Sequence, residues 1–498
     1  MISAITLNLP VFIVIIPLSI AFILPTFARR TKLVEALVIS IETIWIFGAV
    51  YLASIVLLQN GVPIIYNMGG WEAPWGIELK IDNLAVFFIL VVTAVSLPVA
   101  LFAKGNLTEE VGSKERVTRF YVFLLLLGGA MAGMALTNDL FNVFVLVEVA
   151  TLSCCGLVSA QRQPRAAYAA FNYLILATLG STFVLGVIGF IYILTGHLNM
   201  GFAHEQLLQV WQNSPHMVWM AMSFILIGFG VKSAFFPLHV WLPDAHSSAP
   251  APASAILSGL AVKGYIICFL KIMYDVFGQN LMIQFNVNKI LLLMGMIAII
   301  VGSLFALTQD ELKRRLAYST VAQVGYIFLG LGLINLTGLK GTLFYLASHA
   351  VIKSSLFLAA GSIIAATGKK NISDLAGIGR KMPITMGVFT IGSLGLIGIP
   401  LFSGFIGKWY MILGALEAGN ILAAIVIIVG SVLCAAYLLP IIRIAYFEPA
   451  SDEDFQDPGI PQKTALIMLA VAVVILGILP GSILELASRA AAELLMIQ

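Results

Sequence analysis

Five charged residues lie within apolar stretches long enough to cross a lipid bilayer: Glu148, Lys232, Lys263, Lys353 and Lys408. A charged side chain at the bilayer centre costs about 2.5–3.5 kcal/mol on insertion scales, and such residues usually serve ion or proton movement. The alternative for any one of them is a structural ion pair or a side chain that snorkels to the membrane surface. Their number and their separate helices predict a polar path for ions.

The types of these residues suit a proton relay. Glu148 is expected to be the charge partner of Lys232, and Lys263 to take the proton onward. His349 and Lys353 are spaced i, i+4 and so share one helix face. Histidine titrates near neutral pH, and a lysine amine can accept and release a proton.

Composition places these residues in a membrane protein. Of the 498 residues, 60% are hydrophobic and only 10% charged, with a net charge of +3, whereas a soluble domain has about 25% charged residues. No nucleotide-binding, haem, flavin or iron–sulfur pattern is present, and the four cysteines lack metal-ligand spacing. We therefore expect lipid surroundings, no cofactor, no metal and no nucleic-acid partner.

The expected fold is an all-α polytopic membrane protein with about fourteen transmembrane helices. The apolar runs are 9–28, 33–58, 82–103, 118–137, 139–160, 165–195, 217–241, 250–275, 287–308, 315–334, 338–367, 384–412, 416–447 and 463–482. Segment 61–81 is too rich in Gly, Pro and polar residues to span and is expected to form a hairpin or loop. The amphipathic tail 484–496 is expected to lie at the membrane interface.

Helices 7 and 12 of this series are expected to be broken. Pro237 and Pro400 lack the N–H that would bond the carbonyls of Ser233 and Leu396. Kinks of this kind also occur in purely structural membrane helices. Here a buried lysine lies near each break, which favours function because irregular backbone at membrane depth is tolerated only beside protein or water.

An internal repeat is visible in the sequence. Tyr173, Thr195, Gly196 and Asn199 recur 172 residues later, as Tyr345, Thr367, Gly368 and Asn371. The odd number of helices between the copies predicts two inverted five-helix repeats, as in many transporters. The predicted organisation is 1–117 (three helices and the hairpin), 118–275 and 287–447 (one repeat each), and 448–498 (last helix and tail).

Basic residues favour one set of alternate loops, among them Arg29, Arg30, Lys313, Arg314 and Arg315. By the positive-inside rule this side is cytoplasmic and both termini lie outside, in a prokaryotic cytoplasmic (inner) membrane. The other side has few basic residues, with Lys80 and Lys271 among them. Three residues near the cytoplasmic end of broken helix 7 are either a site of proton uptake or ordinary interfacial polar residues: His239, Asp244 and His246.

Four motifs resemble those of a known family: VKSAFFPLHVWLPDAHSSAPAPASAILSGLAVKGY, LVEVATL, SHAVIKSSLF and GIPLFSGFIGKW. The family comprises the antiporter-like subunits of respiratory complex I, Mrp-type cation/proton antiporters and membrane-bound hydrogenases. The resemblance implies fourteen helices with two inverted half-channels. It also implies roles for six residues: Glu148 and Lys232 as coupling pair, Lys263 as central relay, His349 and Lys353 in the second half-channel, and Lys408 as terminal lysine.

The chain length and the lysine at position 408 look most like the D-type component of an Mrp-type antiporter, because the complex I member of similar length usually has a glutamate there. The expected function is thus proton translocation within a multi-subunit Na⁺/H⁺ antiporter, beside further antiporter-like subunits. The alternative is a proton-pumping subunit of a redox complex, which would make the chain part of an oxidoreductase. A stand-alone carrier of an organic solute is a weaker alternative, because no aromatic or amide-rich pocket is predicted.

Overall fold

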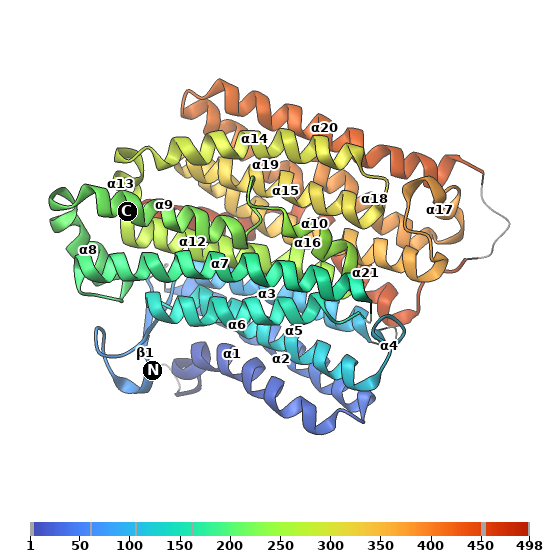
Figure 1. Cartoon of the computed structure of the whole chain (residues 1–498), viewed down its shortest axis with the longest axis horizontal. Coiled ribbons are helices and arrows are strands. Elements are labelled where there is room, and N and C mark those ends of the chain that lie inside the picture. Colours follow the sequence, from blue (N-terminus) through green and yellow to red (C-terminus); the bar gives the residue numbers. More distant parts are fainter. Residues whose placement is uncertain (1–3, 60–61, 105–106, 162, 450–454, 497–498) are drawn as a thin grey trace.

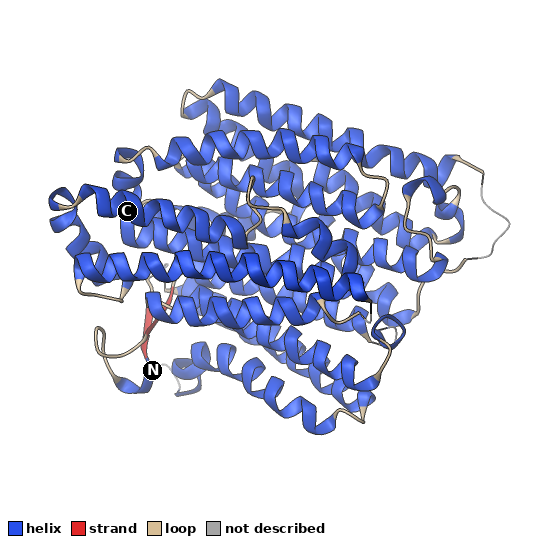
Figure 2. Cartoon of the chain, viewed as in Figure 1, coloured by secondary structure: helices blue, strands red, loops and turns tan. Residues whose placement is uncertain are grey.

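The structure is a computed structural model that describes residues 4–59, 62–104, 107–161, 163–449 and 455–496. It is a bundle of long helices that run roughly side by side (Figures 1 and 2). Within the described residues, twelve helices are long and apolar enough to cross a membrane. This confirms a polytopic all-α membrane protein.

These twelve spans match twelve of the predicted runs, most with ends shifted by a few residues. The helices that contribute to them are α1 (Ala4–Ile23), α2 (Thr31–Leu58), α3 (Asn83–Ala103), α5 (Lys114–Leu136), α6 (Leu140–Val158), α7 (Pro164–Thr195), α9 (Pro215–Lys232), α11 to α13 (Ala251–Gln284 in all), α14 (Val287–Thr308), α16 (Leu336–Thr367), α20 (Ile421–Phe447) and α21 (Ile460–Ile478). The two remaining runs correspond to α15 (Leu312–Gly332), which begins with charged residues, and to the short pair α18 (Pro383–Ile397) and α19 (Ser403–Glu417).

Most of the shorter elements lie at the two ends of the bundle, whereas α10 (Trp241–Ser248) lies within it (Figure 1). The segment after α2 forms the antiparallel hairpin β1 (Ile64–Asn67) and β2 (Glu78–Ile81), as expected. The other short helices are α4 (Leu107–Val111), α8 (Met200–Val210), α10 (Trp241–Ser248), α17 (Ile378–Lys381) and α22 (Gly481–Leu494). Helix α22 is amphipathic, but it packs against α3 and α16 with Leu486, Ala490 and Leu494 buried. The tail thus docks on the protein rather than lying free at the interface, because its apolar stripe matches that surface.

The sequence repeat has a counterpart in local structure. A bridge joins Asp139 to Asn199, and 172 residues later an equivalent bridge joins Glu311 to Asn371. The helices α7 and α16 start and end at equivalent positions, each has 32 residues, and each is capped by a left-handed glycine. The first bridge lies beside α8 and the second near α17, at opposite ends of the bundle (Figure 1). The same motif is therefore used twice in opposite senses, while the bounds of the two five-helix units stay a prediction.

Both predicted breaks are complete interruptions. Helix α9 ends at Lys232 and α10 begins at Trp241, so the chain is not a continuous helix kinked at Pro237. A turn closed by the Phe235 amide on the Gly230 carbonyl ends α9, and the Trp241 indole N–H donates to the carbonyl of Val231. In the same way α18 ends at Ile397 and α19 begins at Ser403, with Pro400 between them.

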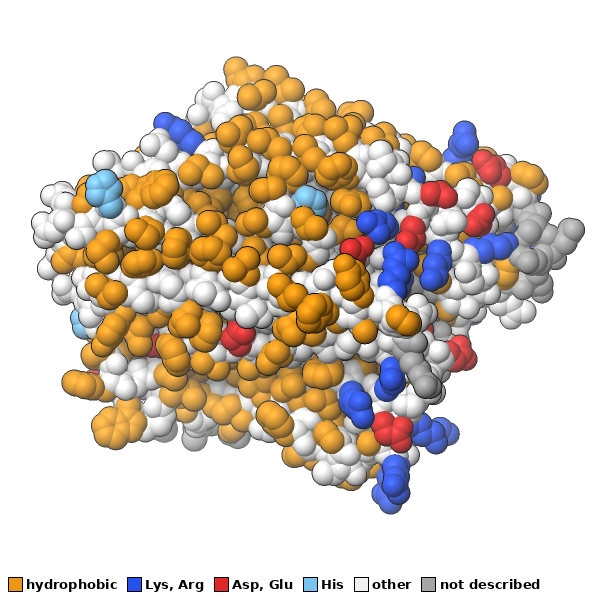
Figure 3. All heavy atoms as spheres, in the orientation of Figure 1, with side chains coloured by type: hydrophobic (Ala, Val, Ile, Leu, Met, Phe, Trp, Pro, Cys, Tyr) orange, Lys and Arg blue, Asp and Glu red, His pale blue; other side chains and the backbone are white. Residues whose placement is uncertain are grey.

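Charge divides the surface. Apolar side chains cover the middle of the face shown in Figure 3, and basic side chains gather at one end. We call the end that carries the α1–α2 turn, α4 and α17 the basic face. The opposite end, with the β1–β2 hairpin and α8, is the hairpin face, and both ends of the chain lie on that side (Figure 1). Lys271, expected among the loop residues, is instead buried within α12 (Val262–Lys271).

Candidate functional site

The first polar cluster joins α6, α7 and α9. Lys232 is the last residue of α9 and is 1% exposed. Its Nζ lies 3.7 Å from Oε1 of Glu148 and donates to the Thr151 hydroxyl at 2.8 Å. The Ser181 hydroxyl donates to the same carboxylate oxygen of Glu148. The predicted pair is therefore brought together, and two small hydroxyl residues that were not predicted complete it.

The two charges of this cluster differ in burial. The side chain of Lys232 is fully buried, whereas that of Glu148 is 31% exposed. The Lys232 amine also lies 5.5 Å from the centroid of the Tyr265 ring, within range of a cation–π contact. Removing one partner of a buried ion pair leaves the other charge uncompensated, which costs about 3–5 kcal/mol.

Lys263 follows a helical irregularity that the sequence did not reveal. Residues Leu257–Ala261 form a π-helical turn, η4, directly before α12. The Lys263 amine donates to the carbonyl of Ser258 in this turn, and the Ser258 hydroxyl lies 2.9 Å from that of Thr320. Single π-helical turns are rare and often lie at functional sites.

The second cluster is centred on α16. Lys353 is fully buried, and its amine donates to the carbonyl of Leu316 at 2.7 Å and to the Ser319 hydroxyl. His349, one turn earlier, is also fully buried, and neither ring nitrogen has a hydrogen-bond partner among the described residues. Such a group has unused capacity to donate and accept protons.

Lys408 lies at the break between α18 and α19. Its Nζ donates to the carbonyl of Leu396 at 2.8 Å and to that of Ile397 at 3.1 Å. These are the last two residues of α18, so the interrupted helix offers its free carbonyls to the amine. The amine also lies 4.6 Å from the centroid of the Tyr326 ring.

A row of three buried polar side chains lies beside these lysines, and two of the three, Gln323 and Tyr437, were not predicted from the sequence. The Tyr345 hydroxyl donates to Oε1 of Gln323, whose Nε2 lies 3.3 Å from the Tyr437 hydroxyl. The ring of Tyr345 is 5.8 Å from the Lys408 amine. All three side chains are fully buried. The only sequence signal was Tyr345, which shares a helix face with His349.

The three residues considered for proton uptake do not converge. Asp244 pairs with Arg314 at 3.1 Å and is 42% exposed. The ring of His239 stacks near Phe236. His246 is fully buried against the Phe357 ring, 4.5 Å between centroids, and so is not an interfacial residue. Helix α10 packs against α7 and α15, which places His246 within the bundle.

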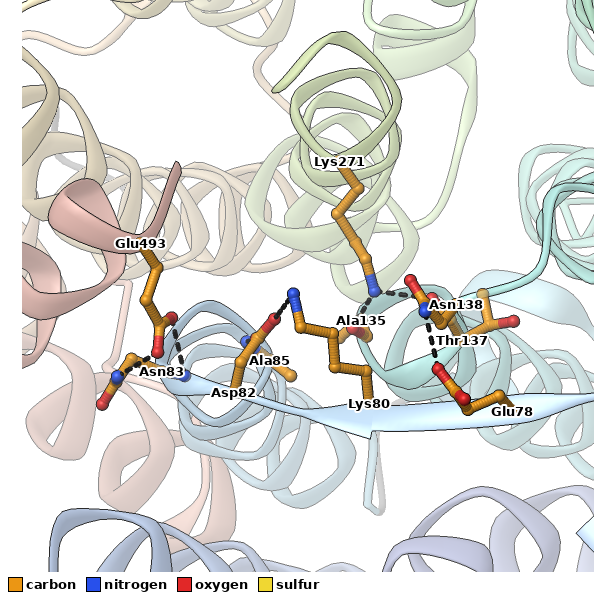
Figure 4. Close-up of polar contacts among 10 residues, drawn as sticks. All are labelled: Glu78, Lys80, Asp82, Asn83, Ala85, Ala135, Thr137, Asn138, Lys271 and Glu493. Carbon is orange, nitrogen blue, oxygen red and sulfur yellow. Dashed lines mark hydrogen bonds and ion pairs between the residues drawn. The ribbon is translucent and has the colours of Figure 1, made fainter. Parts of the chain in front are cut away.

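A separate network of charges lies at the hairpin face (Figure 4). The Lys80 amine is 3.3 Å from Asp82, and the Lys271 amine donates to the carbonyls of Ala135 and Thr137 at the end of α5. Glu493 of α22 accepts from the amide of Asn83 at the start of α3.

Burial, reinforced by the nearby Asp82, raises the pKa of Glu493 to about 7. Burial lowers the pKa of Lys80, but the carboxylates of Asp275 and Asp82 outweigh it and hold that pKa above its usual value. The contacts of this network connect the ends of α3, α5, α12 and α22 that lie at the hairpin face.

Comparison with known proteins places this arrangement in a family. A family profile described as "NADH:quinone oxidoreductase/Mrp antiporter, TM" matches residues 137–434, more than half of the chain. This chain belongs to that family. The matched region contains all six residues expected to relay protons, from Glu148 to Lys408.

Curated members of the NADH:quinone oxidoreductase/Mrp antiporter family resemble the chain over most of its length. NADH-quinone oxidoreductase subunit N of Desulforudis audaxviator is 38% identical, over 92% of this chain and 89% of that protein. A Staphylococcus epidermidis protein, named provisionally as antiporter subunit mnhD2, is 28% identical, over 97% of this chain and 95% of its own.

Solved structures agree with this family assignment. A chain of the Mrp complex from Dietzia sp. DQ12-45-1b has a TM-score of 0.89 at 26% identity, covering 99% of this chain and 98% of that one. A chain of the membrane-bound sulfane sulfur reductase, an archaeal respiratory membrane complex, has a TM-score of 0.89 at 30% identity, covering 98% of both chains. Both are chains of membrane complexes, and this chain is an antiporter-family membrane subunit that works with partner subunits.

Proposed function

We propose that this protein is the proton-translocating component, of the Mrp D type, of a multi-subunit cation/proton antiporter. One observation carries the proposal. Each buried lysine in the series rests on a nearby oxygen acceptor instead of being sealed in apolar surroundings: Lys232 on Glu148 and Thr151, Lys263 on Ser258, Lys353 on Leu316 and Ser319, and Lys408 on Leu396 and Ile397. An amine with an acceptor can hold a proton within the membrane and release it when its surroundings change.

Glu148 and Lys232 form the coupling pair in this proposal. When the carboxylate is close, it stabilises the protonated amine, because opposite charges attract strongly where water is scarce. When the pair opens, that stabilisation is lost and the proton is passed on. Lys263 receives it, and His349 and Lys353 lead it to Lys408.

The two inverted units, 118–275 and 287–447, would each supply one half of the path. Units of opposite sense let one half communicate with each side of the membrane. We assign the basic face to the cytoplasm on the positive-inside rule. Both chain ends then lie outside a prokaryotic cytoplasmic membrane.

A second candidate is a proton-pumping subunit of a redox complex. It is favoured by the 38% identity to NADH-quinone oxidoreductase subunit N and the 30% identity to the sulfane sulfur reductase chain. The two candidates differ in their source of energy. Moving one proton against 100 mV costs about 2.3 kcal/mol, which must be supplied from elsewhere. A sodium gradient supplies it in the first case and electron transfer in partner subunits in the second.

The test is to purify the native complex in mild detergent, identify its subunits by mass spectrometry and reconstitute it in liposomes. Small membrane subunits and proton flux driven by a sodium gradient are expected. Iron–sulfur or hydrogenase-like partners, with flux that needs an electron donor, would support the second candidate. A complex that moves no protons under either condition would contradict both.

A further inference from the structure

One buried carboxylate lies outside the proposed relay. Glu42 belongs to α2, a helix of the N-terminal region outside both repeated units, and its side chain is fully buried. The Ser96 hydroxyl of α3 donates to its Oε1 at 2.8 Å. Its second oxygen, Oε2, has no hydrogen-bond partner among the described residues. An ionised carboxylate in such a position is costly, and the cost falls when the free oxygen binds a proton.

The surroundings of Glu42 differ on its two sides along α2. Toward the basic face lies Glu35, which is two helical turns away on the same helix face and also buried. Toward the hairpin face lies an apolar groove of about 350 Å³, lined by Ile46 and Val50 of α2, Val91 of α3 and residues of three further helices. A second buried carboxylate therefore lies on the basic-face side of Glu42, and an apolar groove on its hairpin-face side.

Charged groups on the neighbouring elements show the same asymmetry. Helix α1 carries none between Ala4 and Ile23, and α3 has none within its bounds, where only the flanking Asp82 and Lys104 are charged. Helix α5 has its ionisable groups in the first turns at the basic face: Lys114, Glu115, Arg116, Arg119 and Tyr121. On α2 itself, Lys32 lies at the same end.

Only α3 separates Glu42 from the centre of the relay. Ser96 faces Glu42, and its neighbour Val95 packs against Gly259 in the π-helical turn η4, where an added methyl group would lie 3.4 Å from Val95 Cγ1. The same turn supplies the Ser258 carbonyl that holds Lys263. The carboxylate and the turn that holds the central lysine thus both pack against α3, and the interaction between two charges is stronger where water is scarce.

We infer that Glu42, with Ser96, is an additional proton-binding site that is loaded from the basic face and controls the charge of Lys263. Its Oε2 gains a proton and becomes neutral, and loss of that proton restores a carboxylate that favours a protonated Lys263. The N-terminal helices then have a part in proton transfer as well as in packing. This inference rests on the proposed proton translocation for its purpose, but the protonation of Glu42 can be measured independently.

The test compares Glu42→Gln, which cannot titrate, with Glu42→Asp, which can, and with Glu72→Gln, an exposed matched control. Infrared difference spectra of the intact complex between alkaline and acid pH should contain the carbonyl stretch of a protonated carboxylic acid. Other carboxylates such as Glu493 also absorb in this region, so the Glu42 component is identified as the part of the band that is lost in Glu42→Gln. It should shift in Glu42→Asp and persist in Glu72→Gln. Proton flux should fall about tenfold in Glu42→Gln, equivalent to the loss of one pKa unit of coupling, and recover in part in Glu42→Asp.

An unchanged spectrum in Glu42→Gln would overturn the inference, and so would an altered spectrum with unchanged flux in an assembled complex. These outcomes are separate from a failure of the proposed function. That failure would show as no proton flux in the unmodified complex, or as normal flux in Lys232→Ala, whatever the spectrum of Glu42.

Discussion

The four lysines of the proposed relay are each held by an oxygen acceptor. Lys232 uses a carboxylate and a threonine hydroxyl, whereas Lys263, Lys353 and Lys408 use backbone carbonyls. Carbonyls become available where a helix ends or widens, as at Ile397 and in η4. Irregular backbone thus supplies the acceptors of Lys263 and Lys408, whereas Lys353 bonds to Leu316 within α15 and Lys232 bonds to side chains.

The hydroxyl of Thr151 is a specific case that can be tested. Replacing Thr151 by Val keeps the shape but removes the acceptor 2.8 Å from the Lys232 amine. A hydrogen bond to a charged group contributes about 1.5–3 kcal/mol, so proton flux should fall about tenfold or more while the complex still assembles. The matched control is Thr182→Val, because that hydroxyl is exposed and bonds only within its own helix. Equal flux in the two variants would contradict a role for Thr151.

The residues of the proposed relay could be predicted from the sequence only in part. Charged residues in apolar helices are rare, so Glu148 and the four lysines were visible at once. Thr151, Ser181 and Ser319 were not, because serine and threonine in membrane helices commonly bond to their own backbone. Thr182 and Ser223 do so here, and so do Thr151, Ser181 and Ser319. Only the packing of neighbouring helices brings the last three beside Glu148 and the lysines.

At the scale of elements, repetition and interruption dominate. The bridges at Asp139 and Glu311 and the equal lengths of α7 and α16 show one local structure used twice. Gly196 and Gly368 end these two helices with positive φ, 73° and 68°. Four identical residues in the sequence were enough to suggest the repeat, because glycine at such a cap is required by the backbone.

These two glycines give a matched pair of stability predictions. Gly196→Ala and Gly368→Ala should each destabilise the protein by roughly 1–2 kcal/mol, the cost of the left-handed conformation for a residue with a β-carbon. No atom lies within 4 Å of an added β-carbon at either site, so backbone strain is the only cause. The measurement is thermal unfolding of the purified protein.

The control for this pair is Gly189→Ala within α7, which is equally free of steric contact. It should be neutral or stabilising, because alanine favours a helix interior over glycine by about 0.5–1 kcal/mol. A similar loss of stability in all three variants would contradict the argument from backbone conformation.

The element boundaries show the limit of sequence reasoning. Pro237 and Pro400 indicated where the two helices are broken, but not how long each interruption is or which contacts close it. These could not be predicted because the turn after Lys232 is closed by tertiary contacts such as the Trp241 indole. The π-helical turn η4 contains no proline that would have indicated it in the sequence. Its Gly259 lies against Ser354, where a residue with a β-carbon would clash.

At the scale of the whole molecule, the two ends carry charged side chains and the middle of the surface is apolar. Basic side chains gather at one end, and the hairpin network lies at the other (Figures 3 and 4). Glu148 is an exception, since its side chain is 31% exposed although it lies within a membrane-spanning helix. A charge facing lipid is costly, so we expect a partner subunit to cover this part of α6 in the assembled complex.

The measurement that tests the relay most directly is proton flux through the intact complex carrying Lys232→Ala, reconstituted in liposomes. The relay predicts at least a tenfold loss of flux with normal assembly, because no other amine lies beside Glu148 among the described residues. Lys289→Ala, an exposed lysine on α14, is the control and should transport normally. Normal flux in an assembled Lys232→Ala complex would contradict the account.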